Sequence, residues 1–279
     1  MNRGGEGHPF EKELPLPEPL PFPPKTFVTE AGRTWRLCLS IKIGGDLIHL
    51  NSMMKPPLHF VTEQENMAYR VKEIFYTLQG EGAQAGRPAV FCRFSGCNLW
   101  SGRPEDRATA KCRFCDTDFV GADAGVFATA EELAQTIAAT FPVLDPQTYG
   151  GRKPYIVFTG GEPALQLTRE LIDRLHALGF ELGVESNGTL PLPEGLDWIT
   201  VSPKGSNPLV TTSGHELKLV WPQQGCSPHD FEDLDFRHFL LQPCDDPRNR
   251  ANTRECIAYC LLHPRWSLGL QTHKWVGVR

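Results

Sequence analysis

Three cysteines offer the clearest reactive chemistry in this chain. Cys97, Cys112 and Cys115 follow one another with the spacing C-x14-C-x2-C. Three thiolates can hold three corners of a four-iron cluster and leave the fourth iron open for a substrate or cofactor, whereas four protein ligands close a structural zinc site. The spacing alone also fits half of a zinc site or a redox pair. The rest of the chain must therefore decide between these readings.

A glycine-rich motif, Thr159-Gly160-Gly161-Glu162-Pro163, lies further along the chain. Its two glycines lack a Cβ, so the backbone can approach a ligand closely, and the proline can begin a helix. Glu162 either fixes the turn or meets an ammonium group. Alone, the motif fits an ordinary strand-to-helix turn. Downstream of a three-cysteine loop, it indicates a site for an amino-acid moiety.

The composition limits the class of protein. The chain has 279 residues, 40% of them hydrophobic, and a net charge of −5, which excludes a broad electrostatic footprint for nucleic acid. No apolar run approaches the ~18 residues of a membrane span, and no basic start precedes an apolar leader. Nine cysteines without a leader fit a reducing compartment. We expect a cytoplasmic protein with neither nucleic acid nor membrane as a partner.

The first 66 residues differ from the rest. Seven of the first 24 are proline, a composition that favours an extended, solvated chain. Residues 34–50 have some apolar character and could form a weak hairpin. A more regular pattern begins at Met67. We predict that residues 1–66 are a disordered extension, or follow an upstream start that the cell does not use, and that residues 67–279 form the catalytic domain.

Short apolar runs alternate with helical patterns after Pro88. Thr129 and Glu132 form a capping box, a second helix starts at Thr168 and ends at Gly179, and a third runs from about residue 253 to 262. This alternation implies an α/β fold with a parallel sheet. About six strands and three main helices indicate an incomplete (β/α) barrel. The predicted strands are residues 89–94, 155–158, 181–185, 198–201, 216–220 and 238–241.

Polar loops follow five of the six predicted strands. In parallel α/β folds, the active site is built at the carboxyl ends of the strands, so one shared site is the simplest interpretation. The loops are the cysteine loop, 159–163, 186–188, 202–204 and 242–245.

At this point the chain resembles the radical S-adenosylmethionine enzymes. In that superfamily three cysteines bind a [4Fe-4S] cluster, the methionine group chelates the open iron, and a Gly-Gly-Glu-Pro loop helps bind the amino group. The usual spacing is C-x3-C-x2-C, and the polar insert 98–111 departs from it. A 14-residue insert is a feature of some 7-carboxy-7-deazaguanine synthases. Further phrases that resemble this family are 76–82, 91–94, 112–117, 185–188, 202–204 and 271–274, so the resemblance covers residues 67–279.

The resemblance implies a reaction and its cofactors. A 5′-deoxyadenosyl radical, made from S-adenosylmethionine, abstracts a hydrogen from 6-carboxy-5,6,7,8-tetrahydropterin. The ring contracts, ammonia leaves, and 7-carboxy-7-deazaguanine forms for queuosine and related 7-deazapurines. The family regenerates S-adenosylmethionine, uses Mg²⁺ and is typically a homodimer, and a flavodoxin is the expected electron donor.

The resemblance also assigns residues, several of which suit the chemistry on physical grounds. Glu81 can accept the guanine-like donor edge of a pterin, although a surface glutamate in a glycine-rich turn is the plain alternative. Arg93 offers fork geometry to the substrate carboxylate, the alternative being a buried structural ion pair. Thr117 matches a magnesium ligand, since Mg²⁺ prefers hard oxygen. Further expected substrate contacts are Leu78, Gln79, Gly80, Thr159 and the C-terminal Arg279. Expected cofactor contacts are Phe114, Cys115, Asp116, Gly161, Glu162, Ser202, Pro203, Lys204, Gln242, Pro243, Cys244 and Asp245.

The remaining cysteines favour structural roles. Cys92 alternates with its strand, and Cys256 and Cys260 share a helix face, so all three are expected in the core. His273 is equally compatible with the site and with a structural role.

Two alternatives stay open. A glycyl-radical activating enzyme would share the cluster, but the chain lacks an extra cysteine-rich insert and such an enzyme would not need residues 79–82. A zinc-stabilised binding module would use the three cysteines plus Cys92 or a histidine, and leaves the Gly-Gly-Glu-Pro loop unexplained.

Overall fold

A computed structural model describes residues 38–43, 46–51, 68–142 and 149–279. The chain divides into two units at Phe60. In the first unit, β1 (Cys38–Ile43) and β2 (Asp46–Asn51) pair antiparallel, with Cys38 opposite Asn51. The hairpin predicted for this part of the chain is thereby confirmed. The predicted disorder concerns mainly residues 1–37 and 52–66, which lie outside the described residues.

The second unit is built on a nine-stranded sheet with the order β11-β10-β9-β8-β7-β6-β4-β3-β5. Strand β4 and strands β6 to β11 run parallel, while β3 pairs antiparallel with β4 and β5. The sheet is open, as expected of an incomplete barrel. The strands are β3 (Tyr69–Leu78), β4 (Pro88–Phe94), β5 (Gly125–Phe127), β6 (Tyr155–Gly160), β7 (Glu181–Ser186), β8 (Trp198–Val201), β9 (Ser213–Trp221), β10 (Asp235–Pro243) and β11 (Trp266–Leu268).

All six predicted strands are confirmed, and the parallel α/β architecture with them. The prediction assigned no strand to β3, β5 or β11. Two of these have three residues each, too few for a recognisable alternation. Strand β3 pairs antiparallel with the next strand along the chain, β4, with Leu78 opposite Pro88. The more regular pattern that begins at Met67 was noted in the sequence but was not assigned to a strand.

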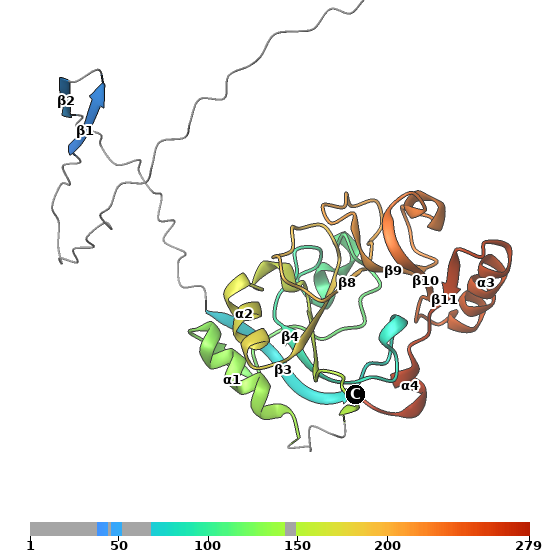
Figure 1. Ribbon diagram of the computed structural model, residues 1–279. Coiled ribbons are helices and arrows are strands. Elements are labelled where there is room, and N and C mark those ends of the chain that lie inside the picture. Colours follow the sequence, from blue (N-terminus) through green and yellow to red (C-terminus); the bar gives the residue numbers. More distant parts are fainter. Residues whose placement is uncertain (1–37, 44–45, 52–67, 143–148) are drawn as a thin grey trace, which may run out of the picture. The chain divides into compact units, whose positions relative to one another are not determined.

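Four α-helices accompany the sheet in the described residues (Figure 1). They are α1 (Ala130–Thr140), α2 (Arg169–Ala177), α3 (Asn249–Leu262) and α4 (Thr272–Val276). Thr129 caps α1 by accepting the N–H of Glu132, whose carboxylate accepts the N–H of Ala128, one residue earlier than a standard capping box. Helix α3 begins four residues before the predicted start, and α4 was not predicted.

The core lies between the sheet and its helices. Strands β4, β6 and β7 bury Phe94, Ile156 and Val184 against Ile137 of α1 and Leu171 of α2. Burying such a side chain fully contributes about 1.5–3 kcal/mol, so this face fixes the sheet that carries the loops.

A second apolar cluster joins β9, β10 and β11 to α3. Cys92 and Cys256 are fully buried, as predicted, while Cys260 is half-buried. None of the helices in the described ranges is both long and apolar enough to span a membrane.

The parallel strands direct five predicted loops to one edge of the sheet. Close to the same edge, α4 and the chain's end return to β3 (Figure 1), where Thr77 Oγ1 donates to the Arg279 carbonyl over 2.9 Å. Segments from both ends of the second unit therefore meet at the predicted site.

Candidate functional site

A cavity of about 430 Å³ opens at this edge of the sheet. Most predicted site residues line it, namely Leu78, Gln79, Gly80, Glu81, Arg93, Cys112, Phe114, Cys115, Asp116, Thr117, Thr159, Gly161, Ser202, Lys204, Gln242, Pro243, Asp245 and Arg279. Four others, Cys97, Glu162, Pro203 and Cys244, lie outside this lining. The structure thus brings residues separated by 200 positions into one cavity.

The three cysteines of the motif belong to the loop after β4. Cys112 is buried, while Cys97 and Cys115 are half-buried. Within the residues that the structure describes, no three Cys, His, Asp or Glu side chains converge on a single point that could hold one metal ion. A tetrahedral zinc site needs such convergence. In an iron–sulfur cluster the thiolates are spread over separate irons, so three cysteines can hold a cluster without converging on one point.

The thiols of this loop are surrounded by hydrogen-bond donors. Burial raises the pKa of the Cys97 thiol, and the N–H groups of Leu99 and Trp100 partly offset this effect. Burial likewise raises the pKa of Cys112, which the positive charge of Lys204 opposes. Donors that point at sulfur stabilise its thiolate form, the form that binds metal.

The glycine motif is packed directly against the cysteine loop. Gly160 has φ +141°, and a Cβ on it would lie 2.2 Å from the Phe94 carbonyl oxygen. A Cβ on Gly161 would lie 1.9 Å from the carbonyl oxygen of Gly96, the neighbour of Cys97. Only glycine fits at either position. Consequently the backbone of the motif stands beside the cysteines, at the wall of the cavity.

Glu162 fixes this turn from inside the protein. Its carboxylate is fully buried and accepts from Ser186 Oγ (2.8 Å), the N–H of Asn187 (2.7 Å) and the N–H of Ala164 (2.9 Å). Burial raises its pKa, against the effect of these donors. Of the two roles considered for Glu162, the contacts correspond to fixing the turn, and they tie the glycine motif to the loop after β7.

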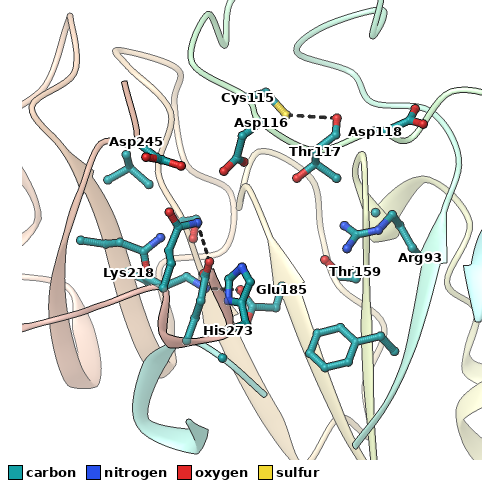
Figure 2. Close-up of a pocket in the computed structure, with 18 of the residues that line it drawn as sticks. Arg93, Cys115, Asp116, Thr117, Asp118, Thr159, Glu185, Lys218, Asp245 and His273 are labelled. Atoms are coloured by element: carbon teal, nitrogen blue, oxygen red, sulfur yellow. Dashed lines mark hydrogen bonds and ion pairs between the residues drawn. The ribbon is translucent and has the colours of Figure 1, made fainter. Parts of the chain in front are cut away.

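An ion-pair cluster lies at one end of the cavity (Figure 2), with the Lys218 side chain 4% exposed and those of Glu81 and Glu185 each 18% exposed. Lys218 Nζ lies 2.6 Å from Glu81 Oε2 and 2.5 Å from Glu185 Oε2, and Gln271 Nε2 donates to Glu81 Oε1 over 2.8 Å. Burial alone would raise the pKa of Glu81, but Lys218 lowers it to about 2. Glu81 is therefore a charged acceptor at neutral pH rather than a surface side chain.

Strand β9, which carries Lys218, also carries Glu216. The pKa of this carboxylate is raised, whereas that of Glu81 is lowered. Glu216 is 1% exposed and accepts the N–H of Ala83 over 2.7 Å. It holds the turn at Gly82, where φ is +71° and a Cβ would lie 2.2 Å from its Oε1. Burial raises the pKa of Glu216 to about 7, with the nearby Glu185 adding to the effect and Lys218 opposing it. Glu216 supports Glu81 from outside the cavity lining.

Arg93 projects into the cavity from β4, near Thr159 and Thr117 (Figure 2). Its Nε donates to Glu73 Oε1 over 2.8 Å, and Arg279 also pairs with Glu73. The structural ion pair that was considered as the alternative role of Arg93 therefore exists, but it uses only the Nε of the guanidinium. Among the described residues, however, nothing accepts a hydrogen bond from its two terminal nitrogens, so they are available to a ligand.

The segment at the start of α4 covers part of the site. Thr272 donates through its N–H and its Oγ1 to the Gly80 carbonyl, each over 2.8 Å. Lys274 Nζ bridges Asp116 (2.7 Å) and Asp245 (2.5 Å). Burial alone would raise the pKa of Asp116, yet Lys274 lowers it. His273 lines the cavity beside Gly80.

Sequence reasoning missed Glu73, Glu185, Lys218, Gln271 and Lys274, all of which line the cavity. A signal existed for Lys218, because Glu216 and Lys218 alternate with two leucines in β9 and so share one face. For Gln271 and Lys274 the signal was the phrase 271–274, which resembles the family but was given no role in the site. They reach the site only through the return of the chain to β3.

No protein-family model matches the chain. It is 59% identical over 218 residues to the 7-carboxy-7-deazaguanine synthase of Nitratidesulfovibrio vulgaris and 59% identical over 216 residues to that of Bradyrhizobium diazoefficiens, in each case with 76% of this chain and 100% of the relative. The crystal structure of QueE from Escherichia coli matches with a TM-score of 0.54 and 27% identity, over 76% of this chain and 100% of that one. On these comparisons and this site, the chain belongs to the 7-carboxy-7-deazaguanine synthase family.

Proposed function

We propose that the protein is a radical S-adenosylmethionine lyase that converts 6-carboxy-5,6,7,8-tetrahydropterin to 7-carboxy-7-deazaguanine with loss of ammonia. The observation that carries the proposal is a single cavity with a three-cysteine loop on one wall and a charged acceptor, Glu81, at its end. Relatives at 59% identity, matched over their whole length, bear the name of this activity.

The residues present fit a [4Fe-4S] cluster. Cys97, Cys112 and Cys115 would hold three irons, and the donor set leaves one iron without a protein ligand. When bound, the cluster supplies the electron for reductive cleavage of S-adenosylmethionine. Gly161, packed on the cysteine loop without room for a Cβ, would offer backbone groups to a ligand beside that loop.

Polar groups next to the cysteines suit S-adenosylmethionine. Gln242 is buried and lines the cavity, and its Oε1 has no hydrogen-bond partner among the described residues. Lys204 Nζ lies 5.4 Å from the ring centroid of Phe114, and Asp116 is held by Lys274. We assign these residues to cofactor binding, together with Cys115, Gly161, Ser202, Pro243 and Asp245, which also line the cavity. Glu162, Pro203 and Cys244 lie behind that lining, where Glu162 holds the turn of the glycine motif.

The opposite part of the cavity suits the pterin. Glu81 is ionised at neutral pH, so it can accept both hydrogens of a guanine-like edge. The free terminal nitrogens of Arg93 present two parallel donors to the substrate carboxylate. The Thr117 hydroxyl, a hard oxygen in the cavity lining, would serve as a protein ligand for Mg²⁺. Leu78, Gln79, Gly80, Thr159 and Arg279 complete the proposed substrate contacts.

Three further features extend the proposal. The enzyme acts in the cytoplasm, as a homodimer, with a flavodoxin as its electron donor. Residues 1–66 are an extension of the catalytic domain at 67–279. Support for this division comes from the relatives, which are matched over their whole length by 76% of this chain.

An anaerobic turnover assay on the full chain tests the proposal. The reaction contains reconstituted cluster, dithionite, S-adenosylmethionine, Mg²⁺ and 6-carboxytetrahydropterin, with products read by mass spectrometry and the Cys112→Ala variant as control. A deazaguanine carboxylate formed without matching consumption of S-adenosylmethionine supports it. Deoxyadenosine without that product rejects the substrate, and failure to take up iron and sulfide rejects the cofactor.

A further inference from the structure

The insert between Cys97 and Cys112 is closed at its base. The carbonyl of Leu99 accepts the N–H of Lys111 (3.0 Å) and the N–H of Cys112 (3.3 Å). The chain therefore leaves and returns at one point, and the long insert does not separate Cys97 from Cys112 in space. Leu99 and Cys112 are both buried at this junction.

An arginine–tryptophan pair occupies the inside of the insert. The Trp100 ring meets Phe119 edge to face, with centroids 5.6 Å apart at 89°. Arg107, in the 3₁₀ helix η2 (Pro104–Thr109), places its guanidinium carbon 3.8 Å from the centre of the Trp100 ring. Stacking of this kind fixes a planar guanidinium in orientation. The orientation of the Arg107 guanidinium is thus fixed by Trp100, independently of its hydrogen bonds.

The oriented guanidinium reaches the second cysteine segment. Arg107 Nη1 donates to the carbonyls of Arg113 (2.9 Å) and Cys115 (3.0 Å). Hydrogen bonds from a charged donor are stronger than neutral ones and fix the direction of the carbonyls that receive them. One side chain therefore connects the turn that carries Cys112 and Cys115 to Trp100, three residues after Cys97.

The same two segments supply the donors around the thiols. The N–H of Leu99 lies 3.4 Å from Cys97 Sγ, next to the tryptophan on which Arg107 stacks. Arg107 does not line the cavity. Its contacts thus act on the arrangement of the sulfurs rather than on a substrate.

We propose that Arg107 is a positioning residue for the iron–sulfur cluster. It holds the Cys112–Cys115 turn against the segment after Cys97, so that the three thiolates are arranged before iron arrives. The inference rests on the cluster assigned in the proposed function. On this inference, the 14-residue insert supplies, through Arg107, the rigidity that a short C-x3-C loop would have.

The test compares three variants with the wild-type chain. Arg107→Met removes the donor and keeps an unbranched side chain, whereas Arg107→Lys restores a charge without the planar fork. Arg103→Met is the matched control, because Arg103 lies in the same insert, is exposed, and donates no side-chain hydrogen bond among the described residues. Iron and sulfide content, the rate of cluster loss to a chelator, the spectrum of the reduced cluster in electron paramagnetic resonance, and the thermal midpoint of the apoprotein are measured.

We expect Arg107→Met to lose its cluster at least about 10-fold faster, because removing a group that orients metal ligands usually lowers metal affinity about 10- to 100-fold. Arg107→Lys should fall between, Arg103→Met should match wild type, and the reduced-cluster spectrum should change only in the Arg107 variants. If Arg107→Met has the iron content and the chelation rate of the wild type, the inference is overturned while the proposed cofactor stands. A lowered apoprotein midpoint with an unchanged chelation rate would overturn it too, in favour of a purely structural role. A wild-type chain without a cluster would overturn the proposed cofactor as well.

Discussion

Replacing Lys218 with methionine should destabilise the protein strongly. Lys218 is 3% exposed and neutralises two carboxylates, Glu81 at 2.6 Å and Glu185 at 2.5 Å. Breaking a buried pair by removing one partner costs about 3–5 kcal/mol, because it leaves charge uncompensated in the interior. For a domain of this size each kcal/mol lowers the melting temperature by about 2–4 °C, so the loss should be about 6–20 °C near pH 8.

The loss should depend on pH with a definite sign. In the wild-type protein, the pKa of Glu81 lies at about 2, so its contribution to stability is present above about pH 4.3 and is lost as pH falls towards 2. Without Lys218, burial raises the pKa of Glu81 above its unfolded value. The variant then gains stability as pH falls through that pKa, and the gap to wild type should narrow from pH 8 to pH 5.

Thermal unfolding of the apoprotein, followed by circular dichroism at several pH values, measures both effects. Lys153→Met serves as the matched control, since it removes the same charge from an exposed position. A Lys218→Met protein that melts within about 2 °C of wild type at pH 8, less than 1 kcal/mol for this size, would refute the reasoning. So would a gap that stays constant with pH.

Three further substitutions test other parts of the site. Burial raises the pKa of Glu216 to about 7, so wild-type stability should fall as pH rises from about 4.3 to 7, by up to about 3 kcal/mol. Glu216→Gln should flatten that slope in urea unfolding, and equal slopes would contradict it. Arg93→Lys should raise KM for the pterin about tenfold or more through loss of the bidentate fork, as a charged hydrogen bond is worth about 1.5–3 kcal/mol, while an unchanged KM would remove Arg93 from the substrate site. Cys112→Ala should abolish cluster absorbance while Cys260→Ala keeps it, and retained absorbance in Cys112→Ala would reject the ligand assignment.

The strands could be predicted because their signal is local. In β6 the residues from Tyr155 to Phe158 are all buried, so the run is apolar on both faces and reads as an interior parallel strand. Helix α2 could be predicted from its N-terminal cap, Thr168, whose side chain accepts the N–H of Leu171. Helix α4 has five residues, less than two turns, and no periodicity can emerge over that length.

The candidate site was predictable only where it follows from topology. Loops after parallel strands converge whatever their sequence, so the cysteine loop, the glycine motif and the segment at 202–204 could be grouped in advance. The residues that pair with the charged side chains of these loops could not be predicted in the same way. Lys274 bridges Asp116 and Asp245 from a position 29 residues beyond the nearer one. Such pairing is decided by how the chain's end returns to the sheet.

The buried ion pair and the proposed pterin contact do not compete for Glu81. An ionised carboxylate has about four acceptor sites, two on each oxygen. Gln271 takes one site on Oε1 and Lys218 takes one on Oε2, which leaves one site on each oxygen. Two donors side by side, as on a guanine-like edge, require that arrangement. Lys218 therefore keeps Glu81 ionised and fixes its plane, and its loss should weaken pterin binding as well as stability.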